Sequence, residues 1–295
     1  MALRFLKLFH PRRVRRASVV SCALVSALTS CMSPMIMNSP PTVVTSGVPA
    51  GYKLVWADEF DTDGLPDPGK WINDTSRNKE GWHNHELQYY SPPRAANAVV
   101  KGGKLIITAR KEKLSSAADW GGQAYTSARL STRGKGDWTY GFFDVRAKLP
   151  CGKGSWPAIW TLGTKGKWPD DGELDIMEQV GREPTRVFGT VHTLQSGGLG
   201  TGEAMQVPDA CTAFHNYQML WTRDEIRFSV DGAEFYRYAN PNTGNVTWPF
   251  DSPQYLILNL AVGGDLGGEV DDSIFPIAFE LDYVRVYQAA PPVIR

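Results

Sequence analysis

Apolar and polar residues alternate along this chain with a period of two, and this alternation most limits the folds it can adopt. In the segment from Lys104 to Arg110, apolar residues stand at positions 105, 107 and 109. A period of two places successive side chains on opposite faces of a β-strand. No stretch keeps the apolar stripe of a helix for three turns. The chain is therefore expected to consist of strands.

The alternation recurs in three later segments. Their apolar positions are Phe143, Val145, Ala147 and Leu149; then Ile226, Phe228 and Val230; then Phe279, Leu281 and Tyr283. Asp231-Gly232 predicts a hairpin turn before Phe235. The run 255–262 is apolar almost throughout, as expected of a central strand covered on both faces. Many short strands separated by Gly and Pro predict an all-β sandwich or jelly roll.

The chain has 295 residues, with 31 Lys and Arg balanced by 31 Asp and Glu. Without a basic excess to neutralise phosphates, nucleic acid is not expected as a partner. Composition is steady from about residue 52 to 288, with no internal repeat, so one domain is predicted over residues 50–290. We expect a monomer.

The N-terminus has the features of an export signal, predicted over residues 1–31. Six basic residues and no acid precede an apolar stretch at 19–28 that is too short to span a bilayer. The sequence Leu28-Thr29-Ser30-Cys31 resembles a lipoprotein lipobox, which implies a lipid on Cys31 and attachment to the cell envelope. A plain secretory signal is the alternative. Residues 32–49, rich in Ser, Pro and Thr, are predicted to be a linker.

Two cysteines, Cys151 and Cys211, remain in the predicted domain. Export to an oxidising compartment would allow one disulfide, but their separation in sequence leaves the pairing open. Neither cysteine has the neighbouring Cys or His of a zinc site.

The segment 170–179 is the most informative for function. As a strand it places Glu173 and Asp175 on one face, but strict alternation would bury Glu178 unpaired, which is costly. A β-bulge around Ile176-Met177 would return Glu178 to the face of the other two acids. Like charges this close raise one another's pKa and help keep one glutamate protonated. A solvated acidic strand is the alternative. Paired carboxylates of this kind suit glycoside hydrolysis.

The motif from Glu173 to Glu178, in its bulged form, resembles the signature of glycoside hydrolase family 16, and its surroundings resemble the laminarinase branch of endo-β-1,3-glucanases. Matching stretches occur in the expected order over nearly all of residues 52–288. They are Glu86–Tyr90, Tyr125–Arg129, Tyr140–Phe143, Gly154–Trp160, Asn259–Gly264 and Asp282–Gln288.

This resemblance implies a β-jelly-roll sandwich of two antiparallel sheets with a concave substrate cleft, and a retaining mechanism. Glu173 would be the nucleophile, Glu178 the acid and base, and Asp175 the partner that sets the ionisation of Glu173. Trp156 and Trp160 would form a sugar platform, with core burial as the alternative for both. The other residues implied to line the cleft are Asn84, Glu86, Arg129 and His192.

One departure from the family pattern lies at the cleft end, where His83 and His85 replace the Gly and Asn more often found there. It leaves the polymer preference open between β-1,3-glucan, mixed-linkage glucan and, less in keeping with the neutral charge, agar or carrageenan. Transglycosylation, a glucan-binding module without chemistry and an adhesion lipoprotein are further alternatives, but the intact acids favour an enzyme.

No cofactor is expected for the chemistry. The resemblance implies one structural calcium ion on the convex side, held by Asp282 with the backbone oxygens of Glu59 and Gly103. A carboxylate with carbonyl ligands suits Ca²⁺ better than zinc. A plain surface acid is the alternative for Asp282.

Overall fold

The computed structural model describes residues 47–290. The predicted signal peptide, Cys31 and residues 32–46 of the predicted linker lie outside the described residues, so those expectations stay predictions. Within 47–290, no helix has the length and apolar character needed to cross a membrane.

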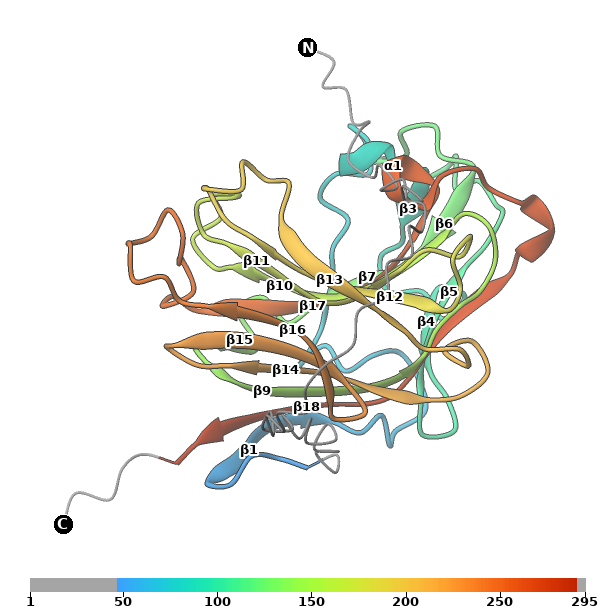
Figure 1. Ribbon diagram of the computed structural model, residues 1–295. Coiled ribbons are helices and arrows are strands. Elements are labelled where there is room, and N and C mark those ends of the chain that lie inside the picture. The colour runs from blue at the N-terminus through green and yellow to red at the C-terminus, as the bar shows by residue number, and fades with distance from the viewer. Residues whose placement is uncertain (1–46, 291–295) are drawn as a thin grey trace, which may run out of the picture. The chain divides into compact units, whose positions relative to one another are not determined.

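Two eight-stranded antiparallel sheets form the two layers seen in Figure 1. The first, here the β9 sheet, has the order β16-β15-β14-β9-β18-β5-β4, with β1 paired to β18. Its strands are β16 (Ala233–Ala239), β15 (Glu225–Val230), β14 (His215–Trp221), β9 (Gly141–Lys148), β18 (Ile277–Ala289), β5 (Leu105–Ala109), β4 (Ala98–Val100) and β1 (Tyr52–Asp58).

The second layer, here the β10 sheet, has the order β13-β12-β11-β10-β17-β7-β2, with β8 paired to β17. Its strands are β13 (Thr201–Gln206), β12 (Arg186–His192), β11 (Glu173–Gln179), β10 (Ser155–Gly163), β17 (Gln254–Val262), β7 (Arg129–Ser131), β2 (Ile72–Asn73) and β8 (Asp137–Trp138). The predicted sandwich of two antiparallel sheets is therefore confirmed.

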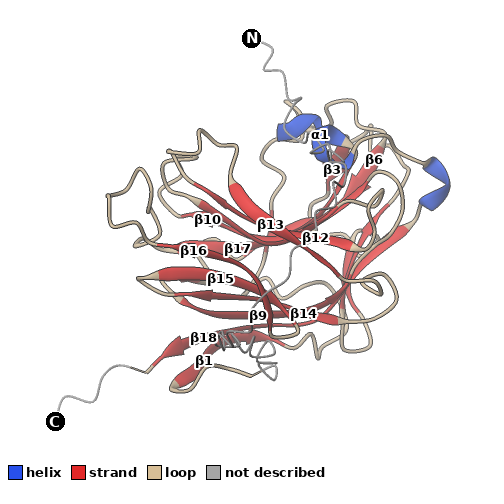
Figure 2. Cartoon of the chain, viewed as in Figure 1, coloured by secondary structure: helices blue, strands red, loops and turns tan. Residues whose placement is uncertain are grey.

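A few small elements lie outside the two layers. Strands β3 (Gln88–Tyr90) and β6 (Tyr125–Ser127) form a separate parallel pair. The helical elements are one turn each: α1 (Gly264–Gly267), η1 (His83–His85) and η2 (Asp272–Ile274). Figure 2 shows how little helix accompanies the strands, as the absence of a helical stripe predicted. In Figure 1, β3 and α1 lie on the side of the β10 sheet that faces away from the β9 sheet.

The core between the layers takes one face of each sheet. Strand β17 is buried at all nine positions, in agreement with the prediction of a central strand. In β9, Phe143, Val145 and Ala147 belong to the core cluster, as their alternation predicted. The hairpin turn at Asp231-Gly232 is also found, with φ of 51° and 80° at its two residues. Such positive φ values are typical of the tight turns that join twisted strands.

One predicted alternation is wrong at its end. Phe279 and Leu281 of β18 are in the core, but a register shift between Leu281 and Tyr283 moves the next core positions to Val284 and Val286. Tyr283 instead donates a hydrogen bond from its hydroxyl to Asp144. A bulge adds one residue to a strand and reverses the faces beyond it, and nothing in the local pattern marked this one.

The structure also joins Cys151 and Cys211 in a disulfide, with the two Cα atoms 5.7 Å apart across 60 residues of sequence. It links the loop after β9 to the loop before β14. The pairing that sequence left open is thereby resolved for the described residues.

Candidate active site on strand β11

Strand β11 carries the three acids on one face because of a bulge. Its pairing with β12 shifts register between Asp175 and Glu178, and its pairing with β10 shifts at the same place. Ile176 and Met177 both enter the core cluster there. The predicted bulge is therefore confirmed.

The neighbouring strands fix which face this is. Across to β10, Glu178 pairs with Ala158 and Asp175 with Trp160. Partners in an antiparallel ladder share a face, and so do residues two apart along a strand. Trp156, Trp160 and all three acids therefore lie on the face of the β10 sheet opposite to its core face.

Glu178 is held by a tryptophan on the adjacent strand. The indole N–H of Trp156 donates to Glu178 Oε1 at 2.9 Å. Trp156 is only 8% exposed, packed with Val180 and Ala261. Because the Trp156 ring is almost fully buried, little of its surface is accessible to a sugar. Its polar contact in the site is the hydrogen bond to Glu178.

Asp175 pairs with a histidine from β12. His192 Nε2 lies 2.9 Å from Asp175 Oδ2, and His192 Nδ1 lies 3.0 Å from the carbonyl oxygen of Gly198. Burial opposes charge on His192, but the hydrogen bond and negative charge of Asp175 raise its pKa to about 10. Near neutral pH the two therefore form an ion pair.

Glu173 has a partner that the sequence interpretation missed. The indole N–H of Trp168 donates to Glu173 Oε2. Trp168 lies in the loop before β11, and it is 53% exposed, so a face of its ring is open to a ligand. Its position five residues before Glu173 was the only available signal, because a loop residue follows no alternation.

Glu173 and Glu178 both ionise less readily than ordinary carboxylic acids. Burial, followed by the charge of Asp175, raises the pKa of Glu173 to about 8. Burial also raises the pKa of Glu178 to about 7, and the hydrogen bond from Trp156 works against that rise. Both side chains nevertheless keep intermediate exposure, so a ligand can reach them. The group can hold one proton near neutral pH, as acid catalysis requires.

Glu173, Asp175 and His192 also meet the geometric requirement for a metal group, with one ligand atom from each lying within 4.8 Å of the others. However, the imidazole Nε2 faces the Asp175 carboxylate, and at that pKa it carries a proton rather than a free lone pair. The cluster fits an ion pair beside a carboxyl group, and it needs no metal to neutralise it.

A chain of hydrogen bonds positions Trp160 and Glu86. Trp160 donates to Asn259 Oδ1 at 2.7 Å, and Asn259 donates in turn to the hydroxyl of Tyr90 at 2.9 Å. That hydroxyl and the amide of Gln88 donate to Glu86 Oε2, at 3.3 and 2.8 Å. Asn259 was missed by the sequence interpretation, although an amide inside the apolar run 255–262 was a signal.

Arg129 stacks with aromatic rings. Its guanidinium carbon lies 4.6 Å from the ring centre of Trp160 and 5.2 Å from that of Trp82, while its Nε donates to Asp74 at 3.0 Å. It thus covers one face of Trp160, which limits that ring as a platform.

The segment with the two unusual histidines folds as η1. Asn84 and His85 have φ of 57° and 56°, and both side chains are exposed. The left-handed region favours Gly and Asn, which explains why those residues are more typical there. His85 Nδ1 lies 2.8 Å from Asp265 Oδ1, so the histidine binds this loop to α1.

The carboxylates near the expected calcium site contact arginines. Asp282 Oδ2 accepts a hydrogen bond from Arg146 at 2.6 Å, and the carboxylate of Glu59 is bound by both Nε and Nη2 of Arg285. The other expected ligands are the backbone oxygens of Glu59 and Gly103, not the Glu59 carboxylate, and the calcium site stays a prediction. No part of the site described above depends on this region.

Two cavities lie elsewhere. One of about 510 Å³ lies among Asp58, Asp63 and Lys70, and one of about 400 Å³ lies among Asp144, Asn216 and Tyr283. Neither contains an acid of β11. The expected concave cleft stays a prediction, since a long groove open at both ends would not form an enclosed cavity.

Comparison with known proteins agrees with this geometry. The family model described as Glycosyl hydrolases family 16 matches residues 86–278. A protein named beta-glucanase from Rhodothermus marinus is 50% identical over 252 residues, which are 80% of this chain and 85% of that protein. A glucan endo-1,3-beta-glucosidase A1 from Niallia circulans is 39% identical, but the match spans only 38% of its length.

Two solved structures are similar as well. The X-ray structure of the laminarinase from Rhodothermus marinus matches with a TM-score of 0.76 and 49% identity, covering 81% of this chain and 98% of that one. A mutant of a non-specific endo-beta-1,3(4)-glucanase matches with a TM-score of 0.79 and 52% identity, covering 82% and 96%. That mutant presents 1,3-beta-D-cellobiosyl-glucose at its active site.

Proposed function

This chain belongs to glycosyl hydrolase family 16, and we propose that it hydrolyses internal β-1,3 bonds of laminarin-type glucans, or of mixed β-1,3/1,4-glucans, with retention of configuration. The observation that carries the proposal is the bulge in β11, which gathers Glu173, Asp175 and Glu178 on one face. A strand without the bulge would turn Glu178 into the core.

Glu173 is the nucleophile in this proposal. Its carboxylate oxygen attacks the anomeric carbon and forms a covalent glycosyl-enzyme ester as the bond to the leaving oxygen breaks. The indole N–H of Trp168 and the imidazolium of His192 both favour the ionised form of Glu173. They oppose the effect of burial on the one carboxyl group that must be charged to react.

Glu178 is the general acid and then the general base. Protonated, it donates to the leaving glycosidic oxygen; ionised, it takes a proton from the water that attacks the ester and frees Glu173. The pKa of about 7 keeps a large fraction protonated near neutral pH. The hydrogen bond from Trp156 holds Oε1, which leaves Oε2 for the substrate.

Asp175 positions Glu173. Its pairing with His192 brings one positive charge close to two carboxyl groups, so that Glu173 can ionise beside Asp175 without two uncompensated negative charges. The net reaction consumes one water and releases one new reducing end. Two carboxyl groups and water account for every proton, so the chemistry needs no cofactor.

The substrate is inferred from the relatives. The mutant enzyme that presents 1,3-beta-D-cellobiosyl-glucose at its active site is 52% identical to this chain, and the Rhodothermus marinus beta-glucanase is 50% identical. Trp168, more than half exposed beside Glu173, offers a ring face for the apolar face of a glucose unit next to the cleaved bond.

We also propose that the protein is exported and carries a lipid on Cys31, on the strength of the basic, apolar and Leu-Thr-Ser-Cys segments in order. Cys31→Ser should move the protein from the membrane fraction to the soluble exported fraction. Equal membrane retention of the variant would reject the lipid anchor and leave a plain secretory signal.

Reducing-end release tests the proposed activity. The full-length protein is incubated with laminarin, mixed-linkage glucan and agarose, and products are separated by size. Release of short oligosaccharides from laminarin is expected, with no release by Glu173→Ala. Activity on agarose alone would keep the mechanism but reject the substrate. Binding to glucan with no release on any polymer would indicate a binding module.

A further inference from the structure

The Cys151–Cys211 disulfide lies directly behind the proposed acid and base. Gln179 follows Glu178 on β11, and consecutive strand residues point to opposite faces, so Gln179 points into the sandwich. Gln179 is fully buried and pairs with Val187 of β12. Its side chain meets the disulfide from the core side while Glu178 faces the substrate.

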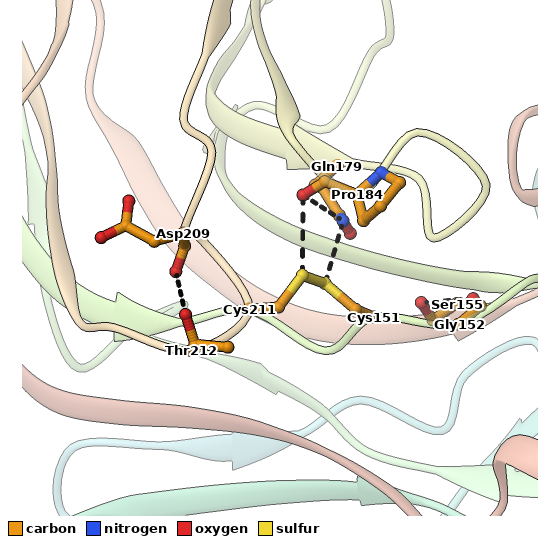
Figure 3. The surroundings of a disulfide bond; sticks show 8 residues. All are labelled: Cys151, Gly152, Ser155, Gln179, Pro184, Asp209, Cys211 and Thr212. Carbon is orange, nitrogen blue, oxygen red and sulfur yellow. Dashed lines mark hydrogen bonds between the residues drawn. A yellow bond between two sulfur atoms is a disulfide. The ribbon is translucent and has the colours of Figure 1, made fainter.

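The contacts of Gln179 are with the disulfide and the turn beside it. Gln179 Nε2 donates to Cys151 Sγ at 3.7 Å and to the carbonyl oxygen of Pro184 at 3.2 Å. Cys211 Sγ lies 3.7 Å from the same carbonyl oxygen. Figure 3 shows both sulfur atoms against this pair of residues. Within residues 47–290, Gln179 Oε1 has no hydrogen-bond partner, so the Nε2 contacts are the ones that orient this side chain.

The loop that begins at Cys151 also holds the start of β10. The carbonyl oxygen of Gly152 accepts hydrogen bonds from the backbone N and Oγ of Ser155, at 3.0 and 2.9 Å, and the carbonyl of Ser155 accepts from Gly181 at 2.9 Å. A Cβ on Gly181 would lie 1.8 Å from the Gly152 oxygen, so the end of β11 and this loop are in direct contact.

Trp156 and Glu178 therefore sit at the two strand ends that this loop ties together. Trp156 follows Ser155 in the chain, and Glu178 precedes the turn that contains Gly181. Their shared hydrogen bond of 2.9 Å depends on the spacing of these ends. On the far side, the disulfide fastens the loop to the segment before β14, where Leu149 also bonds to Ala210.

We propose that the Cys151–Cys211 disulfide and Gln179 are positioning elements for Glu178, keeping its carboxyl group in line with the leaving glycosidic oxygen. This inference rests on the proposed function. Neither element touches substrate. Glu173 lies at the opposite end of β11, where Trp168 and His192 hold it, so loss of the disulfide acts on acid catalysis before it acts on the nucleophile.

Leaving-group chemistry separates these two effects. A dinitrophenyl leaving group departs without a proton, so the first step on a dinitrophenyl laminari-oligosaccharide needs Glu173 but not Glu178. The phenyl analogue and laminarin both need the proton. A rate loss that affects the phenyl analogue and laminarin, but not the dinitrophenyl substrate, therefore identifies a displaced Glu178 carboxyl group. General destabilisation of the protein would slow the reaction of all three substrates.

Three full-length variants provide the test. Cys151→Ala with Cys211→Ala removes the disulfide without leaving a free thiol, and Gln179→Met replaces the amide with an apolar side chain of similar volume. Gln218→Met is the matched control: Gln218 is also buried, but it bonds to Asp144 in the other sheet. Single-turnover phenol and dinitrophenol release and the kcat and KM for laminarin are measured for each.

We expect both test variants to lose roughly 10- to 100-fold in phenol release and in kcat on laminarin, with KM and dinitrophenol release changed less than about threefold. Gln218→Met should keep both the rate of phenol release and the kcat on laminarin. Equal losses with both leaving groups, or no loss in a folded Gln179→Met, would overturn the positioning role. If the double cysteine variant does not fold, the comparison of phenol and dinitrophenol release by Gln179→Met tests the positioning role by itself. An inactive wild-type protein would instead reject the proposed function.

Discussion

The indole N–H of Trp156 on β10 donates a hydrogen bond to Oε1 of Glu178 on β11, across 2.9 Å. The two strands are neighbours in one sheet, so strand register brings the donor and the acceptor together. The bulge at Ile176 determines that register. A backbone feature thus places the acid at a fixed distance from its donor.

Trp156→Phe removes that donor while keeping an aromatic ring. A hydrogen bond to a charged group contributes about 1.5–3 kcal/mol, so we expect kcat on laminarin to fall roughly 10- to 100-fold. Because the bond from Trp156 lowers the pKa of Glu178, its loss should also move the pH profile towards higher pH. Trp160→Phe is the matched control, since Trp160 bonds to Asn259 instead, and it should leave the profile in place.

The pH dependence of kcat/KM follows from the paired glutamates. Burial raises the pKa of Glu173 to about 8 and that of Glu178 to about 7, so together they lose their protons over this range. The reacting form holds one proton, on Glu178. Because the pKa of Glu173 is the higher of the two, most singly protonated molecules carry that proton on Glu173 instead, and the observed values belong to the pair. We expect a bell-shaped profile with its maximum near pH 7–8, falling on the acid side as Glu173 becomes protonated. Full activity at pH 5 would contradict this ionisation scheme.

Trp168→Phe tests the residue that sequence interpretation missed. The hydrogen bond from Trp168 lowers the pKa of Glu173, so its removal should raise that pKa and cut kcat/KM by about tenfold at neutral pH. Raising the pH should recover part of the loss. Since Trp168 is 53% exposed, the free energy of unfolding, measured by thermal denaturation, should change by less than about 0.5 kcal/mol. An unchanged pH profile would show that this bond does not tune the nucleophile.

Apolar side chains buried in strand β17 should contribute strongly to the free energy of unfolding. Leu258 is fully buried in a strand covered on both faces. Leu258→Ala should lower the free energy of unfolding by about 2–5 kcal/mol through the lost apolar burial and the cavity left behind. Leu65→Ala provides the comparison, because Leu65 is 48% exposed, and its effect should stay within about 0.5 kcal/mol. Chemical denaturation measures both.

The strands and the acids could be predicted because each has a local signal. Alternation at Phe143 to Ala147 marks a half-buried strand wherever its partners lie, and the cost of burying Glu178 required the bulge in β11. For the second bulge, before Tyr283, a straight strand over the predicted segment from Phe279 to Tyr283 would have buried no charged residue, so no such cost indicated the bulge. A tyrosine is tolerated on either face, so nothing in the sequence excluded the straight strand.

Partners across the chain could not be predicted in the same way. Trp168 and Glu173 are near in sequence, but a loop decides their contact. The disulfide between Cys151 and Cys211 depends on two loops from different strands of the β9 sheet. The contact of Arg146 with the Asp282 carboxylate joins residues 136 positions apart in the sequence. Each of these depends on tertiary packing that no local pattern encodes.

The most direct test of the account is to trap the covalent intermediate. A 2-deoxy-2-fluoro laminaribioside with a dinitrophenyl leaving group slows both steps, and the good leaving group lets the ester accumulate. The full-length protein is inactivated, digested, and its peptides are measured by mass spectrometry. We predict one added disaccharide on Glu173, with protection by laminarin oligosaccharides. An adduct on Glu178 or another residue, or turnover with no adduct and inversion of the product anomer, would contradict a retaining mechanism through Glu173.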